Sequence, residues 1–208
     1  MENGASEMVT NPATSVVSMV YNFQLMKMFG ENGIAAYGII MYESIIFMAL
    51  FFGYLMGSAL IVSYHYGAAN TDELKNLFRK RIVILFATGI VIFSLSEITA
   101  LLLVKIFAGK DKELFDVTLM GFRLYSVSFI IMGFSVWGSS FFMALNNGTV
   151  SAILSFLKTM VFEVASVIIL PRILGKNGIW LSVSLAELMA FMLTAFFIVK
   201  NRKKYNYI

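Results

Sequence analysis

The chain has 208 residues, of which 59% are hydrophobic and 13% are charged. With a mean hydropathy of +0.82, it has too little polar surface to cover a water-soluble globule of this size. The net charge of +4 comes from two lysine and arginine clusters in short loops, which favours a membrane topology signal over nucleic-acid binding. The absence of cysteine excludes disulfides and thiolate metal sites.

Six long apolar segments fill most of the chain, each long enough to cross a hydrocarbon core about 30 Å thick as a helix. They lack the strand-like alternation of an outer-membrane barrel. We therefore predict an all-α fold, a polytopic transmembrane six-helix bundle that forms a single domain over residues 1–208. The expected spans are residues 7–29, 34–62, 82–107, 117–145, 149–171 and 178–199, with a basic tail at 200–208.

The first span has no basic region before it and no small-residue cleavage pattern, which indicates a retained span and not a signal peptide. Spacings of four, three, four and four residues place its polar side chains on one helical face. These side chains are Glu7, Asn11, Thr14, Ser18 and Asn22. Such a stripe favours the lining of a cavity, the alternative being hydrogen bonds to a neighbouring helix. Pro12 leaves a free carbonyl that could serve a cation, or is simply tolerated.

Ionisable residues also occur in the next three spans. Because a charge at mid-bilayer costs about 2.5–3.5 kcal/mol, each such residue needs a partner. Glu97 and Arg123 come from consecutive spans at similar depth, which predicts a structural ion pair between them. A structural pairing is also favoured for Glu43. Gly53 and Gly57 form a GxxxG pattern and the fourth span contains further glycines, which together predict close helix approach.

In the fifth span Ser151, Ser155 and Lys158 share one helical face, whereas Glu163 lies well round the helix, so Lys158 and Glu163 are poor partners for each other. Lys158 then needs a carboxylate from another helix or reaches toward the cytoplasmic surface, and the sequence leaves both open. The deep Glu163 is equally open to a functional or a structural role. For Glu187 in the last span, a structural pairing is favoured.

No catalytic pattern is present. The glycine–lysine segments near Gly109 and Gly175 lack the residues that a phosphate-binding loop needs. His65, the single histidine, is expected in the loop after the second span without metal ligands nearby. We therefore expect neither an enzyme, nor a metal site, nor a cofactor, and transport is the function class that remains.

Basic residues in short loops set the orientation of membrane helices, since they stay on the cytoplasmic side. One cluster lies between the second and third spans and the other follows the sixth. Their members are Lys75, Arg79, Lys80 and Arg81, and Lys200, Arg202, Lys203 and Lys204. An even number of spans puts both clusters on one side, which predicts a multi-pass protein of the cell membrane with both termini in the cytoplasm.

The segment GSALIVSYHYGAANTDELKNLFRKR, residues 57–81, resembles the multidrug and toxic-compound extrusion (MATE) family, whose transporters carry a similar loop and basic amphipathic helix after the second helix of each half. Other segments agree. SEMVTNPATSVVSMVYN is similar to the family's seventh helix, GFRLYSVSFIIMGFSVWGSSFFMALNNG to its tenth, and GKNGIWLSVSLAELMA to its last. The resemblance covers nearly the whole chain and matches the carboxy-terminal six-helix half of a twelve-helix transporter.

The resemblance implies a secondary active transporter lobe that exports drug-like or cationic amphiphilic compounds by antiport with H+ or Na+. The acidic cation-site residue of the lobe's first helix falls on Glu7. With the polar residues noted above, the expected cation-coupling residues are Glu7, Asn11 and Glu163. The expected substrate-path residues are Thr14, Ser18, Asn22, Ser155 and Lys158. The implied partners are the lipid bilayer, a small-molecule substrate, and an amino-terminal six-helix half or a second copy.

Two features of the sequence depart from the family pattern. No acidic residue occurs between Val117 and Gly148, where some branches place a second cation ligand, and Leu60 stands where a proline is frequent. The coupling ion is therefore open. The alternatives are a truncated, non-transporting fragment or a subunit that stabilises a partner, and a related lipid or polysaccharide flippase.

Overall fold

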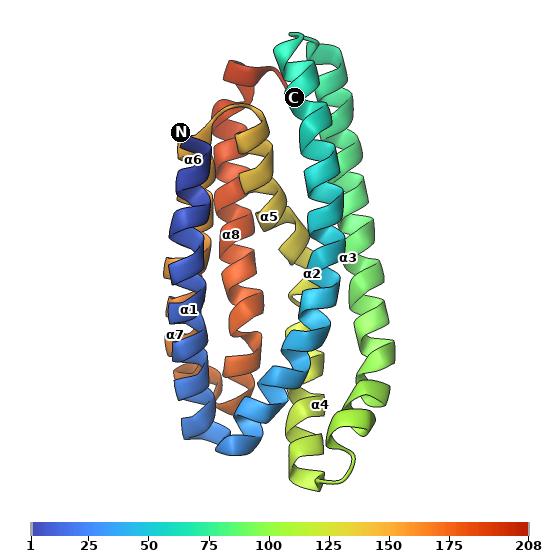
Figure 1. Ribbon diagram of the computed structural model, residues 1–208, viewed down its shortest axis with the longest axis vertical. Coiled ribbons are helices and arrows are strands. Elements are labelled where there is room, and N and C mark those ends of the chain that lie inside the picture. Colours follow the sequence, from blue (N-terminus) through green and yellow to red (C-terminus); the bar gives the residue numbers. More distant parts are fainter. Residues whose placement is uncertain (1, 208) are drawn as a thin grey trace.

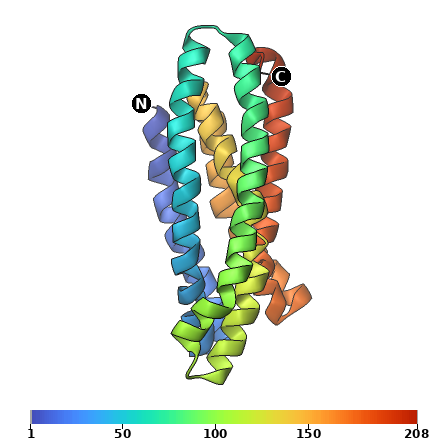
Figure 2. The ribbon, with the colours of Figure 1, turned by 90° about the vertical axis from the view of Figure 1, so that its right-hand side faces the viewer.

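A computed structural model of the chain describes residues 2–207, with side chains described from Ala13 onward. This part of the chain is helical and contains no strand. The elements are α1 (Glu2–Phe29), α2 (Glu31–Gly67), α3 (Thr71–Ala108), α4 (Lys112–Ser126), α5 (Phe129–Ala144), α6 (Gly148–Phe156), the π-helix η1 (Leu157–Glu163), α7 (Val164–Leu174) and α8 (Lys176–Tyr205). Figures 1 and 2 show an elongated bundle in which the long helices run up and down.

Both ends of the described chain and the α2–α3 turn lie at one end of the bundle, and the α1–α2, α3–α4 and α7–α8 turns lie at the other (Figure 1). The α1–α2 and α7–α8 turns are very short. Gly30 has φ 63° and Gly175 has φ 58°, a backbone conformation that favours glycine because it has no Cβ. The first basic cluster lies in the first turns of α3 and the second lies at the end of α8. Both clusters therefore lie at the end of the bundle that contains the α2–α3 turn (Figure 1).

Four helical stretches are long and apolar enough to cross a membrane: α2, α3, the continuous run Gly148–Leu174 and α8. The pair α4 and α5, bent by 50° at a short break, makes a fifth. α1 adds a sixth long helix, since its 28 residues extend about 42 Å at 1.5 Å per residue. The predicted all-α membrane bundle is confirmed.

The hairpin of α2 and α3 is longer than predicted. α2 continues to Gly67 and α3 already begins at Thr71, so the expected loop is a short turn in which the Asn70 side chain caps α3 by accepting from the backbone N–H of Glu73 at 3.1 Å. The placement of His65 in a loop was wrong, because it lies in the last turn of α2. Hydropathy marks the part of a helix inside the membrane and misses its polar ends.

The fourth span is broken, whereas the sequence predicts one continuous helix over 117–145. At the break Ser126 Oγ donates to the Arg123 carbonyl at 2.8 Å. The Ser128 backbone N–H bonds to the Tyr125 carbonyl at 2.9 Å, three residues back instead of four. Serine side chains compete for helical backbone groups in this way, and the chain changes direction between α4 and α5.

Glycines permit close contact between particular helices. A Cβ atom at Gly89 of α3 would lie 2.7 Å from the Ile130 carbonyl oxygen of α5, and one at Gly133 of α5 would lie 2.6 Å from the Phe51 ring of α2. At Gly53 and Gly57 no described atom lies within 4 Å of the position of a Cβ. Close approach is thus confirmed for the fourth span, whereas the GxxxG pattern meets no other helix among the described residues.

The carboxy-terminal residues are part of the packed bundle. α8 continues to Tyr205, and the Tyr207 side chain is fully buried and donates from its hydroxyl to the Ile198 carbonyl at 2.8 Å. Its ring stacks on Phe78 of α3, with centroids 5.4 Å apart. The tyrosines of the predicted basic tail therefore close the end of the bundle, while Lys203 and Lys204 are exposed.

Candidate functional site

A buried ion pair joins the π-helix η1 to α8. Lys158 Nζ lies 2.8 Å from Glu187 Oε1, and the two side chains are 14% and 3% exposed. Lys158 Nζ also donates to Ser135 Oγ of α5 at 3.0 Å, and the Ser135 hydroxyl donates to Glu187 Oε2. The sequence left two alternatives open for Lys158. In the structure it pairs with a carboxylate from another helix and does not reach toward the surface. Glu187 is thus paired, as predicted, and its partner is Lys158.

Glu163 closes the same π-helical segment and lies half-buried within the bundle. In a regular α-helix, residues five apart differ by about 140° around the axis, but the i→i+5 hydrogen bonds of a π-helix widen the turn and bring them closer to one line. Glu163 interacts electrostatically with both Lys158 and Glu187. No hydrogen bond or ion pair to its carboxylate occurs among the described side chains, and Lys158 pairs with Glu187 instead.

A ladder of serines continues from this network between α5 and α6. Ser139 Oγ lies 2.9 Å from Ser151 Oγ and 2.8 Å from Ser155 Oγ. Ser155, expected on the substrate path, is thus half-buried and hydrogen-bonded inside the lobe. Lys158 and Ser155 therefore belong to one polar seam between α5 and the α6–η1 segment.

The described part of the polar stripe of α1 lies on the exposed face of that helix. Thr14, Ser18 and Asn22 are exposed on the lobe. The buried face of α1 is formed by Ala13, Val17, Tyr21 and Leu25. The side chains of Glu7 and Asn11 lie outside the described residues. Among the described side chains of the stripe, Ser18 and Asn22 form no hydrogen bond or ion pair with Glu163, and the cation-coupling and substrate-path assignments stay predictions.

The predicted pair of Glu97 and Arg123 is confirmed, with Nε and Oε2 4.0 Å apart and side chains that are 31% and 61% exposed. Ser126 Oγ donates to Glu97 Oε1 at 2.7 Å. Glu43 is buried and accepts from the hydroxyls of Ser96 at 3.2 Å and Thr99 at 3.4 Å. Its partners are hydroxyl groups of α3 and not a cation.

Arg81 was missed as a structural residue, because the sequence places it in a basic cluster of a loop. The guanidinium is buried and donates to the Ser58 carbonyl of α2. Helical spacing could have revealed it, since Leu74, Phe78, Arg81 and Leu85 recur at intervals of four, three and four on the buried face of α3.

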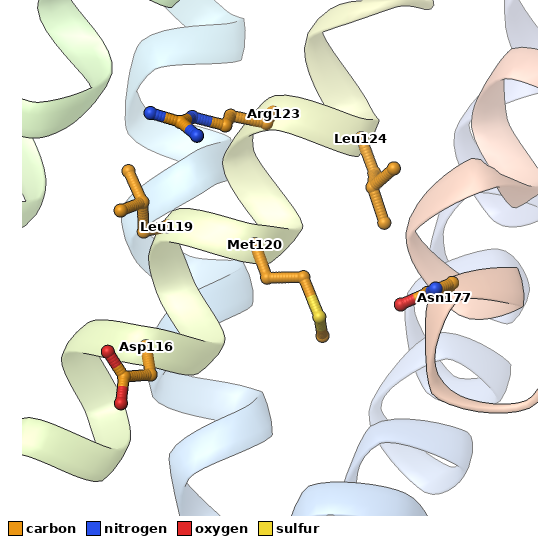
Figure 3. A pocket seen from close by; sticks show the side chains of 6 residues that line it. All are labelled: Asp116, Leu119, Met120, Arg123, Leu124 and Asn177. Atoms are coloured by element: carbon orange, nitrogen blue, oxygen red, sulfur yellow. The ribbon is translucent and has the colours of Figure 1, made fainter.

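A surface hollow lies between α4 and the start of α8, at the end of the bundle away from the termini. Its lining residues are Asp116, Leu119, Met120, Arg123, Leu124 and Asn177. Figure 3 shows Met120 directed toward Asn177, whereas Asp116 and Arg123 point to the other side of α4. Because its charged groups do not converge, this hollow is a poorer candidate site than the buried network of Lys158 and Glu187.

Comparisons with known proteins agree with this architecture. The MatE family profile matches residues 8–169. A MATE crystal structure in complex with MaL6 is similar with a TM-score of 0.86 at 18% identity, covering 97% of this chain and 47% of that chain. The Vibrio cholerae MATE transporter VcmN in the bent form gives a TM-score of 0.89 at 15% identity, with 99% and 46% covered. No curated protein matches the sequence. The chain spans about half the length of the solved transporters.

Proposed function

Because the chain belongs to the MatE family, we propose that it is the carboxy-terminal six-helix lobe of a secondary active transporter that exports drug-like or cationic amphiphilic compounds in exchange for H+ or Na+. The family match over residues 8–169 carries this proposal. The similarity of nearly the whole chain to just under half of MATE transporter structures supports its assignment as one lobe.

The exposed face of α1 supports a path between this lobe and a second one. Thr14, Ser18 and Asn22 face outward, beside the large apolar side chains of Met19 and Phe23, which are 70% and 71% exposed. A surface of alternating polar and apolar groups suits an amphiphilic substrate better than it suits lipid alone. An amino-terminal six-helix half, or a second copy, would supply the opposite wall.

Within this proposal Glu7, Asn11 and Glu163 exchange the coupling cation. A cation that neutralises a buried carboxylate changes the stability of the surrounding helix contacts, and this can drive the alternation between outward and inward openings. The protein is multi-pass, and the shared end of the two basic clusters supports cytoplasmic termini in the cell membrane.

The experiment is reconstitution of the chain in proteoliposomes, alone and with an amino-terminal six-helix MatE half, followed by efflux of ethidium under an imposed pH or Na+ gradient. We expect efflux from the two-half preparation that stops when both gradients are removed and that is lost in Glu7→Gln. The control is Glu31→Gln, an exposed carboxylate at the start of α2. Gradient-independent dye movement would contradict antiport, and no movement in any preparation would favour the stabilising subunit.

A further inference from the structure

The Lys158 ammonium has the surroundings that a bound metal cation would have. It lies 2.8 Å from Glu187 Oε1 and 3.0 Å from Ser135 Oγ. The other carboxylate oxygen of Glu187 accepts from the Ser135 hydroxyl. The strongest oxygen ligands at the junction of α5, η1 and α8 are thus already used by a positive charge that belongs to the chain.

Glu163 adds a second negative charge to this cluster. The formal charges of Lys158, Glu187 and Glu163 sum to −1, so that one proton at Glu163 makes the cluster neutral. The other described titratable groups that interact with Glu163 are uncharged phenols on α1, α2 and α4, namely Tyr21, Tyr37 and Tyr125.

The helices on either side of η1 add no charge at this point. The α6 sequence GTVSAILSF has no titratable residue, and Arg172, the only one in α7, is exposed in its last turn. α1 and α8 also pack against η1, and among the described side chains Lys158 is the single basic group that interacts electrostatically with Glu163.

A sodium ion at Glu163 would need several oxygen ligands to replace its water, as hard cations do. In the described part of the chain, no group of three or more acidic, histidine or cysteine side chains could hold a metal ion. The second carboxylate that would complete such a site is the one that Lys158 occupies. A proton needs only the carboxylate itself.

We propose that Lys158 is a built-in substitute for a coupling metal cation, so that the η1 cluster exchanges one proton at Glu163 and does not bind sodium. Lys158 stays on Glu187 in both states, and the proton joins or leaves a Glu163 carboxylate oxygen. This inference rests on the proposed transport function for its purpose, but the ion preference is a property of the lobe alone.

The first test uses the full chain in nanodiscs. We expect the same melting temperature in Na+ and K+ at equal ionic strength. Infrared difference spectra recorded on acidification should contain a protonated-carboxyl band that disappears in Glu163→Gln and persists in Glu113→Gln, an exposed carboxylate of α4. Binding of radioactive sodium to the wild-type chain that is lost in Glu163→Gln would overturn the proposal.

The second test removes the built-in cation. In Lys158→Gln the carboxylates of Glu187 and Glu163 remain without a positive charge, and we expect Na+ but not K+ to raise the melting temperature by roughly 2–4 °C. Lys158→Arg keeps the positive charge and should show no such rise. The double variant Lys158→Gln, Glu187→Gln removes the second carboxylate and should show none either. A sodium response of the same size in the wild-type chain would contradict the proposal.

Dye efflux separates this inference from the proposed function. Efflux driven by a Na+ gradient at equal pH, and lost in Glu163→Gln, would overturn the proton assignment while leaving the transporter function intact. If no gradient drives efflux, the transporter function fails, whereas the sodium and infrared measurements on the lobe still decide the ion preference.

Discussion

At the scale of single residues, two ion pairs of the lobe differ in how much water surrounds them. The side chains of Lys158 and Glu187 are 14% and 3% exposed, whereas those of Arg123 and Glu97 are 61% and 31% exposed. Removing one member of a buried pair leaves an uncompensated charge, but water and salt screen the remaining member of an exposed pair. The first pair should therefore be far more sensitive to substitution.

We expect Lys158→Met to lower the free energy of unfolding by about 3–5 kcal/mol, because Glu187 would stay buried without its cation. Arg123→Met should lower it by about 1 kcal/mol or less. The measurement is unfolding by SDS titration in mixed micelles. Adding Glu187→Leu to Lys158→Met should restore most of the loss, since the carboxylate that lost its ion-pair partner is then removed as well. Equal effects of the two single substitutions would show that burial does not set the strength of these pairs.

At the scale of elements, helix contacts depend on where glycine is placed and not on how often it recurs. Gly89 lies where α3 meets a backbone carbonyl of α5, and a backbone atom cannot turn aside as a flexible side chain can. Gly53 lies on α2 with no described atom near the position of its Cβ. The two glycines look alike in the sequence, yet only the first is needed for packing within the lobe.

Gly89→Ala should therefore destabilise the lobe by about 1–3 kcal/mol, because α3 and α5 must move apart. Gly53→Ala should be neutral or should stabilise it by up to about 1 kcal/mol, since alanine favours a helix interior over glycine. Thermal unfolding of the two variants in one detergent provides the comparison. A loss at Gly53 equal to that at Gly89 would mean that α2 packs on something within this chain at that face.

The end of α8 gives a second prediction for an element. Tyr207 is fully buried, and its ring lies 5.0 Å from that of Phe141 as well as on Phe78. Tyr207→Ala should cost about 3–5 kcal/mol, as expected for the truncation of a buried aromatic side chain. Tyr64→Ala, at a side chain that is 72% exposed, should change stability by no more than about 0.5 kcal/mol. The rate of proteolysis at the carboxy terminus should increase in Tyr207→Ala and stay unchanged in Tyr64→Ala.

At the scale of the whole molecule, the fold class could be predicted because the bilayer imposes length and apolarity on every span. The pairing of Glu97 with Arg123 followed from depth alone. The partner of Lys158 could not be predicted in this way, because it depends on how η1 packs against α8. The π-helix, which brings positions 158 and 163 closer to one line, has no simple pattern in the sequence. Tertiary contacts decided these features, whereas the break between α4 and α5 has local hydrogen bonds of Ser126 and Ser128 that the hydropathy pattern does not show.

The outward stripe of α1 gives a prediction about the assembled transporter. The chain has no cysteine, so single cysteines can report water access without a background signal. We expect a membrane-impermeant charged thiol reagent to label Ser18→Cys in the two-half preparation, because in the proposed transporter the stripe lines a polar path between the lobes. Ile98→Cys, at an apolar α3 position that is 74% exposed, should stay unlabelled because lipid covers it.

Protection by a substrate tests whether the proposed path on this face of α1 is also the export path. Ethidium bound between the lobes should slow labelling of Ser18→Cys and leave unchanged the labelling of Lys110→Cys, an exposed position in the α3–α4 turn. Protection at both positions would indicate a general change in shape. Labelling of Ser18→Cys no faster than that of Ile98→Cys would mean that the stripe faces lipid or is sealed by a helix, and the path would then have to run along another face of the lobe.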